Sequence, residues 1–225
     1  MVRTRMSEVY AQLGRVGLRR HRRPGRLEIG LDEAGRGCLA GPLAVGAVVL
    51  APGRRSPRDL DDSKRVAPER RTELRAWIET HALAWAVAWA SPAEIDEENV
   101  LQATMSAMHR AVDAVQLQLA ALLGGPPRSR FADRPRALLV DGHYFRPYAG
   151  LPHDCERGGD GRFQAIAAAS ILAKCHRDER MRALDAEYPV YRWASNKGYP
   201  TPPHQRALRE YGPSPWHRRS FRLTY

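Results

Sequence analysis

Apolar and polar positions alternate along the chain in the manner of a domain built from strands and helices. Apolar runs predict strands over Leu27–Leu31 and Ala44–Leu50, joined through a glycine-rich turn. Alternating Ala and Trp predict a strand over Ala82–Ala90, and a short buried strand over Ala137–Val140 delivers Asp141. The opening strands favour an antiparallel start to the sheet.

Helical spacing predicts three long helices, over Pro68–His81, from Ser91 to about Leu123, and from about Gln164 to Glu187. The second has a clear start signal: Ser91 at the N-cap, Pro92 at the first helical position and Glu94 at the third. A further short helix is possible near Ser7–Leu18. Strands alternating with long helices predict an α/β domain around a mixed β-sheet flanked by helices.

The distribution of charge along the chain indicates the kind of partner. The 225-residue chain has a formal net charge of +11, and the charge lies at the ends. Residues 1–26 carry eight arginines and one glutamate, and residues 189–225 carry seven Lys or Arg and one glutamate. The middle, 27–188, is slightly acidic, with a net charge of −2. This distribution suits a protein that binds polyanions with its ends and holds cations at its centre.

Composition also excludes several classes of protein. The longest apolar run, Cys38–Ala51, is interrupted by Gly41, Pro42 and Gly46, so no membrane span is expected. The N-terminus lacks the apolar stretch of a secretory signal. The three cysteines, at positions 38, 155 and 175, have no CxxC spacing and predict neither a disulfide framework nor a zinc site. We therefore expect a cytoplasmic protein.

Acidic residues stand at similar places in the predicted structure. Asp32 and Glu33 close the first strand, Asp141 closes another, and Asp160 precedes the last long helix. Convergent carboxylates suit hard divalent cations such as Mg²⁺, which prefer oxygen ligands. Adjacent strand residues point to opposite faces, so we expect the strand to end at Asp32-Glu33, before Gly35. Spacing alone equally fits ordinary turn and cap residues.

A glycine-arginine turn, Gly35-Arg36-Gly37, follows directly. Its glycines let the backbone approach a ligand closely, and Arg36 could hold a phosphate. A tight hairpin turn with a solvated arginine explains the same three residues equally well. The turn is not a P-loop, because the GxxxxGK[ST] pattern is missing.

Taken together and in order, several segments resemble the ribonuclease HII family. They are IGLDEAGRGCLAGPLAVGAVVL (Ile29–Leu50), DDSK (Asp61–Lys64), EIDEENVLQATMSAMHRAV (Glu94–Val112), LLVDG (Leu138–Gly142), GDGRFQAIAAASILAK (Gly159–Lys174), NKGYPTPPH (Asn196–His204) and YGPSPWHRRSF (Tyr211–Phe221). The resemblance covers about residues 26–222. It implies a ribonuclease H-like mixed sheet flanked by helices, with a C-terminal helical extension.

The resemblance also assigns residues. The family's four acidic metal ligands, which are its catalytic residues, fall on Asp32, Glu33, Asp141 and Asp160. Its turn that senses the ribose 2′-OH falls on Gly35, Arg36 and Gly37, and its deoxyribose-packing tyrosine falls on Tyr199. Lys64 and Ser170 match positions connected with substrate-backbone contacts. Gly158, His143 and Pro200 depart from the family pattern, which bears on substrate preference and rate more than on the ligands.

The activity thus implied is endonucleolytic hydrolysis of the RNA strand of RNA–DNA hybrids, and incision 5′ of ribonucleotides embedded in duplex DNA. Two Mg²⁺ or Mn²⁺ ions would act together and leave 5′-phosphate and 3′-hydroxyl ends. We expect a flexible basic tail (1–25), a catalytic domain (26–187) and a substrate-binding extension (188–225) packed on it. A monomer is expected; a sliding-clamp partner is possible but no clamp-binding peptide is evident.

Two other functions account for part of the same pattern. Ribonuclease HIII shares similar acidic residues, but that family has a sizeable N-terminal substrate-binding domain, which 25 arginine-rich residues cannot form. A basic nucleic-acid-binding protein without catalysis would explain the charge and leave the carboxylates without a role.

Overall fold

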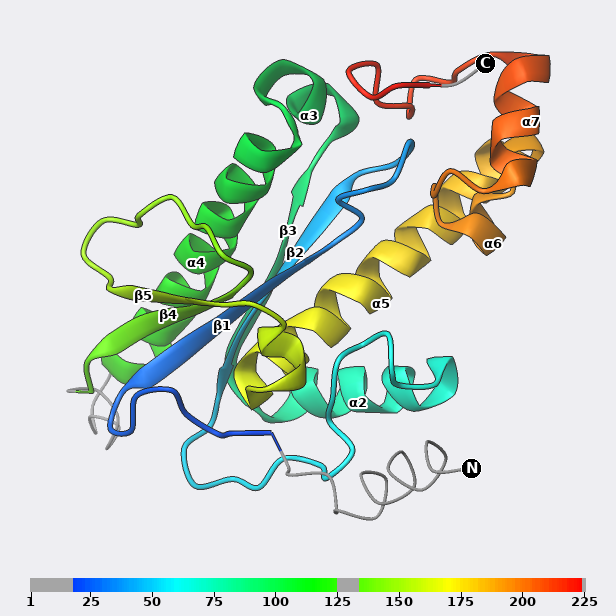
Figure 1. Ribbon diagram of the computed structural model, residues 1–225. Coiled ribbons are helices and arrows are strands. Elements are labelled where there is room, and N and C mark those ends of the chain that lie inside the picture. Colours follow the sequence, from blue (N-terminus) through cyan, green and yellow to red (C-terminus); the bar gives the residue numbers. More distant parts are fainter. Residues whose placement is uncertain (1–17, 125–133, 224–225) are drawn as a thin grey trace, which may run out of the picture.

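The computed structural model describes residues 18–124 and 134–223, which build a five-stranded sheet with helices on both faces (Figure 1). The strands, in the spatial order β3-β2-β1-β4-β5, are β1 (Leu27–Ala34), β2 (Leu43–Leu50), β3 (Ala82–Ala90), β4 (Arg136–Asp141) and β5 (His153–Glu156). β1, β2 and β3 pair antiparallel, whereas β1, β4 and β5 pair parallel. The predicted mixed sheet is confirmed.

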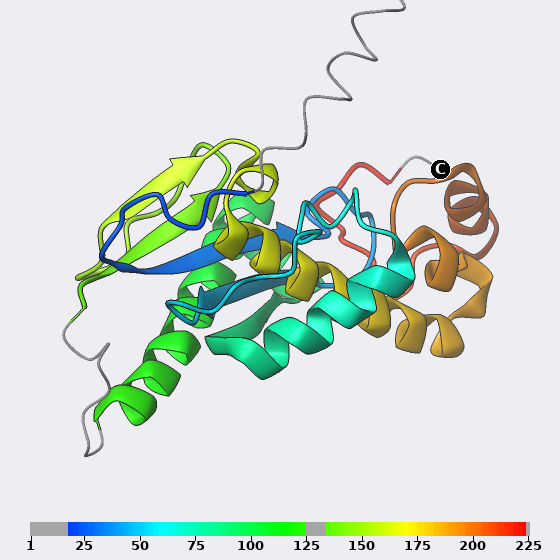
Figure 2. The same ribbon diagram turned by 90° about the horizontal axis from the view of Figure 1, so that it is seen from below.

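The helices form a layer on each side of the sheet (Figures 1 and 2). On one side α3 (Pro92–Glu98) and α4 (Val100–Gly124) pack in one core with Ile29 and Leu31 of β1. On the other side α2 (Pro68–His81) and α5 (Gln164–Glu187) pack in a second core around Val48 of β2. The predicted bounds of α2, α5 and β3 are confirmed.

The long helix predicted from Ser91 is wrong in one respect, because it is two helices. Its start is as expected: Ser91 and Glu94 form a capping box. However, Asn99 has a φ of 69°, which breaks the helix after Glu98. The Asn99 side chain then accepts the N–H groups of Leu101 and Gln102, at 3.0 and 3.1 Å, and so caps α4. Asparagine is enriched among the non-glycine residues that adopt a positive φ, and its side chain can cap the helix that follows, which fits a break at this position.

Two segments outside the predicted strands and helices are ordered. β5 has the sequence HDCE, whose polarity hides a strand that pairs only with β4. Residues 18–25, assigned to the basic tail, lie along the domain. The Arg19 N–H bonds Arg162 O at 2.8 Å, and the Arg20 guanidinium bonds Ala51 O at 2.8 Å. The possible helix near Ser7–Leu18 and most of the predicted loop 124–135 lie outside the described residues.

Small residues bring α5 unusually close to the sheet. A Cβ at Gly30 would lie 2.2 Å from the backbone of Ala165, and one at Gly46 would lie 2.2 Å from Ala169 O. The alanine-rich face of α5, including Ala169, is fully buried. This contact matters for function because the segment that leads into α5 is thereby held against the end of β1.

The C-terminal part packs on the far end of α5. The 3₁₀ turn η2 (Pro189–Tyr191) and the helices α6 (Trp193–Asn196) and α7 (Pro202–Tyr211) surround the fully buried Trp193. This third core also contains Leu39 and Ala40 from the β1–β2 connection. The extension is thus tied to the loop that follows Asp32 and Glu33. Among the helices of residues 18–124 and 134–223, none combines the length and apolar character that crossing a bilayer requires.

Candidate active site

The register of the parallel strands brings two of the expected acids together. Leu31 of β1 lies opposite Val140 of β4, so Asp32 and Asp141 follow side by side at the same edge of the sheet. Contrary to expectation, β1 does not end at this point. Asp32 pairs with Gly46 and Glu33 with Val45 of β2. The strand ends directly before Gly35 as expected, but Asp32 and Glu33 lie inside it and not at its end, because β2 pairs with β1 up to Ala34.

Asp32 and Glu33 consequently point to opposite faces. Asp32 shares its face with Gly30, the face that packs on α5. Glu33 shares the α4 face with Leu31 and opens into a cavity of about 440 Å³. The cavity is lined by Glu33, Arg36, Leu101, Met105, Met108, Asp141, Gly142, His143 and Tyr144. Asp141, at the strand end, is near both acids.

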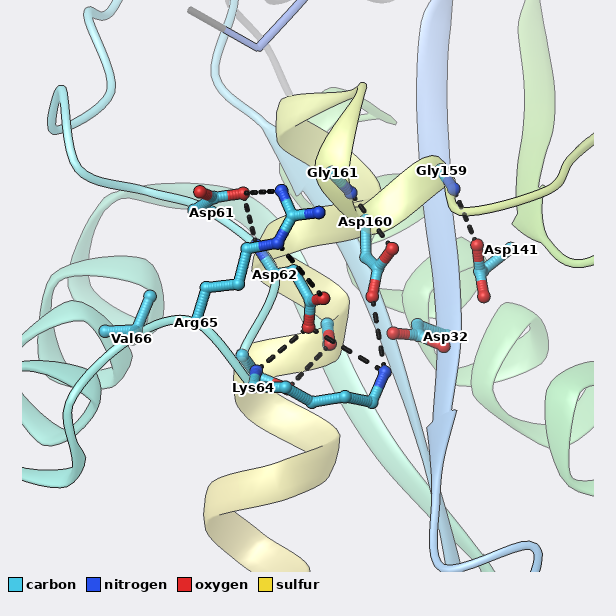
Figure 3. A network of polar contacts seen from close by, with 12 residues as sticks. Asp32, Asp61, Asp62, Lys64, Arg65, Val66, Asp141, Gly159, Asp160 and Gly161 are labelled. Atoms are coloured by element: carbon cyan, nitrogen blue, oxygen red, sulfur yellow. Dashed lines mark hydrogen bonds and ion pairs between the residues drawn. The ribbon is translucent and has the colours of Figure 1, made fainter. Parts of the chain in front are cut away.

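Asp160 enters from the segment before α5. It lies in the 3₁₀ turn η1 (Gly159–Gly161), and Figure 3 shows its carboxylate gathered with those of Asp32 and Asp141. The Gly159 N–H donates to Asp141 Oδ1 at 2.7 Å, and this bond joins η1 to the end of β4. The Gly161 N–H likewise donates to Asp160 Oδ1 at 2.9 Å. In both aspartates one oxygen is held by a backbone N–H group, and the second oxygen of Asp160 lies 3.6 Å from the Lys64 ammonium.

Burial and mutual repulsion perturb these acids. The pKa of Asp32 is raised well above its usual value by burial, and then by the charges of Glu33, Asp141 and Asp160. Burial also raises the pKa of Glu33 against the opposing influence of Arg36, whose Nη1 lies 3.5 Å from Glu33 Oε1. The pKa of Asp160 is raised by burial and by Asp141. The cluster thus concentrates more negative charge than its neighbours neutralise, as a cation site requires.

The site has the right donors for a hard divalent cation, though not as a closed cage. Across the described ranges 18–124 and 134–223, no group of three or more His, Cys, Asp or Glu side chains is arranged as a ready-made metal cage. An oxygen-only donor set that leaves room for water fits Mg²⁺ or Mn²⁺, which keep several water ligands.

Lys64 and Ser170 lie on the α5 side of the cluster. The Lys64 ammonium is 3.6 Å from Asp160 Oδ2 and 3.7 Å from Asp62 Oδ1 (Figure 3). Ser170 is buried, and its hydroxyl bonds that of Ser63 at 2.9 Å. Ser170 therefore ties α5 to the loop that carries Lys64, whereas Lys64 itself reaches solvent.

The turn and the tyrosine also meet. Tyr199 is 42% exposed, and its hydroxyl interacts with the thiol of Cys38, the residue that follows Gly37. The Leu39 N–H donates to Gly198 O at 2.8 Å, and a Cβ at Gly198 would lie 2.3 Å from Ala40 O. The loop after β1 and the loop bearing Tyr199 thus form one surface beside the carboxylates.

Sequence reasoning misjudged two arginines here. Arg177 lies among charged residues of the last long helix and Arg218 in the basic C-terminal part, so local sequence predicts that both are exposed. Both are buried, at 1% and 0% exposure, and bond backbone carbonyls of the turn region. A signal for Arg177 was present, because it follows Ala173 and precedes Met181 at four-residue intervals on the buried face of α5.

His204 and His217 pack inside the C-terminal part and do not face the solvent. Both are buried, with their Nε2 atoms 3.1 Å apart. His204 Nδ1 lies 2.9 Å from Tyr199 O and must donate, so its Nε2 accepts from Trp193 Nε1 at 3.1 Å. The Ser214 N–H donates to His217 Nδ1 at 2.9 Å, which places the His217 proton on Nε2. Both rings are neutral and support the Tyr199 loop.

The strand order, the flanking helices and the acids at the β1–β4 edge define a nuclease of the ribonuclease H type. The family model for Ribonuclease HII matches residues 29–225. The chain belongs to the ribonuclease HII family and is an endonuclease of the metal-dependent kind that this family comprises.

Individual relatives agree. The Ribonuclease HII of Parabacteroides distasonis is 47% identical over 199 residues, covering 88% of this chain and 92% of the relative. That of Porphyromonas gingivalis is 46% identical, covering 87% and 89%. The ribonuclease H2 structure from Pyrococcus horikoshii OT3 has a TM-score of 0.66 at 25% identity, covering 87% and 94%. A structure of ribonuclease HIII with Mn²⁺ gives a TM-score of 0.52 at 18% identity and shares the fold. The ribonuclease HII assignment is confirmed over ribonuclease HIII.

Proposed function

We propose that this endonuclease hydrolyses the RNA strand of RNA–DNA hybrids and incises duplex DNA on the 5′ side of an embedded ribonucleotide, leaving 5′-phosphate and 3′-hydroxyl ends. The observation that carries the proposal is the meeting of Asp32, Glu33, Asp141 and Asp160 from three separate segments at one edge of the sheet. These four acids are proposed as the catalytic and metal-binding residues.

Divalent Mg²⁺ or Mn²⁺, two ions during catalysis, would be held by these carboxylates. Bound there, the ions supply an activated water and stabilise the leaving 3′-oxygen. Asp141 is proposed to serve both, because it lies between Asp32 on the α5 face and Glu33 on the α4 face. Backbone N–H groups fix Asp141 and Asp160 in place, so these ligands are pre-oriented before metal binds.

Recognition of the sugar is assigned to the surface beside the acids. Gly35, Arg36 and Gly37 would read the ribose 2′-OH with backbone groups, which can donate and accept at close range. Tyr199, exposed on the adjoining loop, would pack on the next deoxyribose, where a 2′-OH would crowd its ring. Lys64 is exposed enough to contact a phosphate of the substrate backbone, and Ser170 would support its loop.

The domain organisation, the cellular location and a partner of the enzyme can be proposed in the same way. We propose a catalytic domain over 26–187 with a substrate-binding extension over 188–225, and basic residues 1–25 attracted to duplex phosphates. The three cysteines are free, which fits a reducing, cytoplasmic setting for a monomer. A solved relative is a PCNA:RNase HII complex from Archaeoglobus fulgidus, so a sliding clamp is a partner to test.

The test uses a DNA duplex with one ribonucleotide, labelled at the 5′ end, with Mg²⁺ or Mn²⁺. Wild-type enzyme should incise 5′ of the ribonucleotide, and Asp141→Asn should abolish incision. Glu73→Gln is the matched control, since this glutamate is exposed on α2 and pairs with Arg70. Binding without incision in either metal would show a non-catalytic nucleic-acid-binding protein and would overturn the proposal; so would products ending in a 2′,3′-cyclic phosphate.

A further inference from the structure

Two buried arginines lie beneath the Gly35-Arg36-Gly37 turn without an acidic partner. Arg218 is 0% and Arg177 is 1% exposed, and within residues 18–124 and 134–223 neither forms an ion pair. Burying a guanidinium is costly unless its donors are satisfied. Here backbone carbonyls satisfy them, so the arrangement fixes the path of the backbone that surrounds them.

Arg218 bonds the turn itself. Its Nη2 donates to Gly35 O at 2.7 Å and its Nη1 donates to Arg36 O at 2.9 Å. Its Nε and Nη2 also donate to Gly41 O, at 3.1 and 2.9 Å. One planar guanidinium therefore holds two successive peptide groups of the turn and the carbonyl of the residue where the loop closes.

The direction of the remaining donors follows from peptide geometry. In a planar trans peptide the C=O and N–H bonds point opposite ways. Because the carbonyls of Gly35 and Arg36 point at Arg218, the N–H groups of Arg36 and Gly37 point away from it. Arg36 and Gly37 are exposed, and neither N–H finds an acceptor in the part of the chain that the structure describes. Two free donors are thus aimed outward, next to Glu33.

Arg177 extends the same framework to the tyrosine loop. Its Nε donates to Pro42 O at 2.9 Å and its Nη2 to Ala40 O at 3.2 Å, at the far end of the turn region. Its Nη1 donates to Lys197 O at 2.8 Å, two residues before Tyr199. The buried side chain of Arg177 therefore fixes the spacing between the turn and Tyr199.

We propose that Arg218 is a positioning residue for sugar discrimination: it aims the N–H groups of Arg36 and Gly37 at the 2′-oxygen of the ribonucleotide. A hydroxyl oxygen accepts two hydrogen bonds, whereas a deoxyribose carbon offers none. Arg177 keeps Tyr199 at a fixed distance from those donors. This inference rests on the proposed function.

The first experiment compares Arg218→Lys and Arg218→Gln with wild type. Each would be placed in an Asp141→Asn background to measure the affinity for a duplex with one ribonucleotide relative to an all-DNA duplex. We expect this ratio to fall roughly tenfold, the effect of about one misdirected hydrogen bond, while all-DNA affinity stays within about twofold. With Asp141 intact, kcat on the ribonucleotide duplex should fall more than KM rises.

Leu74→Ala is the matched control, because Leu74 is buried in the core between α2 and α5, a cluster that contains no residue of either sugar-reading loop. It should lower thermal stability and leave the affinity ratio unchanged. If folded Arg218→Lys and Arg218→Gln keep the wild-type ratio, the inference is wrong. If wild type itself fails to incise the ribonucleotide duplex, the proposed function fails first, so the two failures are distinguishable.

A second measurement needs no Arg218 variant and applies even where those variants fail to fold. In the Asp141→Asn protein, the amide protons of Arg36 and Gly37 should exchange freely without substrate. Both should become protected and shift in ¹⁵N NMR on adding the ribonucleotide duplex, and less so with all-DNA duplex. Equal response to both duplexes would overturn the inference.

Discussion

Replacing Gly35 with alanine should destabilise the fold far more than the same change at Gly37, two residues away. Gly35 has a φ of +94°, and a Cβ there would lie 1.9 Å from Nε of Arg177. At Gly37 a Cβ would meet nothing within 4 Å, and the backbone there does not have the positive φ of Gly35. The pair isolates one structural feature within a single turn.

The size of the effect follows from two contributions. An L-residue in the left-handed region costs about 1–2 kcal/mol. Arg177 cannot move aside cheaply because three carbonyls hold it, at 2.9, 2.8 and 3.2 Å. Losing one or more of these charge-assisted bonds adds about 1.5–3 kcal/mol. The sum for Gly35→Ala is about 3–5 kcal/mol, against about 0.5 kcal/mol or less for Gly37→Ala.

Thermal and urea unfolding, followed by circular dichroism without metal, measure the difference. At about 2–4 °C per kcal/mol, the Gly35→Ala midpoint should fall by roughly 6–20 °C, whereas that of Gly37→Ala should stay within about 2 °C. Equal losses for both variants, or a fall of under about 2 °C for Gly35→Ala, would refute the claim that Arg177 is pinned beneath Gly35.

Three further predictions follow from the charges. Asp32→Asn should abolish cleavage yet raise the midpoint of metal-free thermal unfolding at pH 7. The reason is that a carboxyl group with a raised pKa favours the folded state only while it is protonated, and this contribution is lost as pH rises. The stability gained by the variant should therefore shrink towards pH 4. Burial lowers the pKa of His217 to about 4, so NMR should show a neutral His217 ring at pH 6, and its contribution to stability should be lost as pH falls from about 6.5 to 4. Saturating Mg²⁺ or Mn²⁺, at about 100 times Kd, should add about 2.7 kcal/mol to the free energy of unfolding of the wild-type protein. The increase should be measurably smaller for Asp141→Asn, and EDTA should reverse the increase in both proteins.

Most helices and strands could be predicted from the sequence because local residue patterns determine them. The bounds of α2, α5 and β3 follow from residue spacing, and the order of motifs led to the family that the comparisons confirm. The break at Asn99 could not be predicted from the sequence. A single residue with a positive φ between two helical segments leaves the spacing of apolar residues nearly intact. β5 was missed because its four polar residues are stabilised by pairing with β4 and not by a buried face.

The geometry of the site needed tertiary information. Sequence spacing could not show that Asp32 and Glu33 serve opposite faces of a strand that continues past them, since this depends on the pairing of β1 with β2. Arg218 lies 183 residues from Gly35, whose carbonyl it bonds. No local pattern distinguishes such an arginine from a phosphate-binding one, because its role depends on backbone carbonyls that are distant in the sequence.

The way charges are satisfied at this edge explains why the acids stay available. Had Arg177 or Arg218 been paired with Asp32 or Asp141, the pairs would have stabilised one another and lowered the affinity for cations. Instead the guanidiniums bond carbonyls, and the aspartates bond N–H groups, as in the 2.7 Å bond from the Glu33 N–H to Asp32 Oδ1. The backbone thus satisfies the buried guanidiniums of Arg177 and Arg218 without drawing on the acids. Metal binding is expected to relieve the mutual repulsion of these acids and so to stabilise the fold.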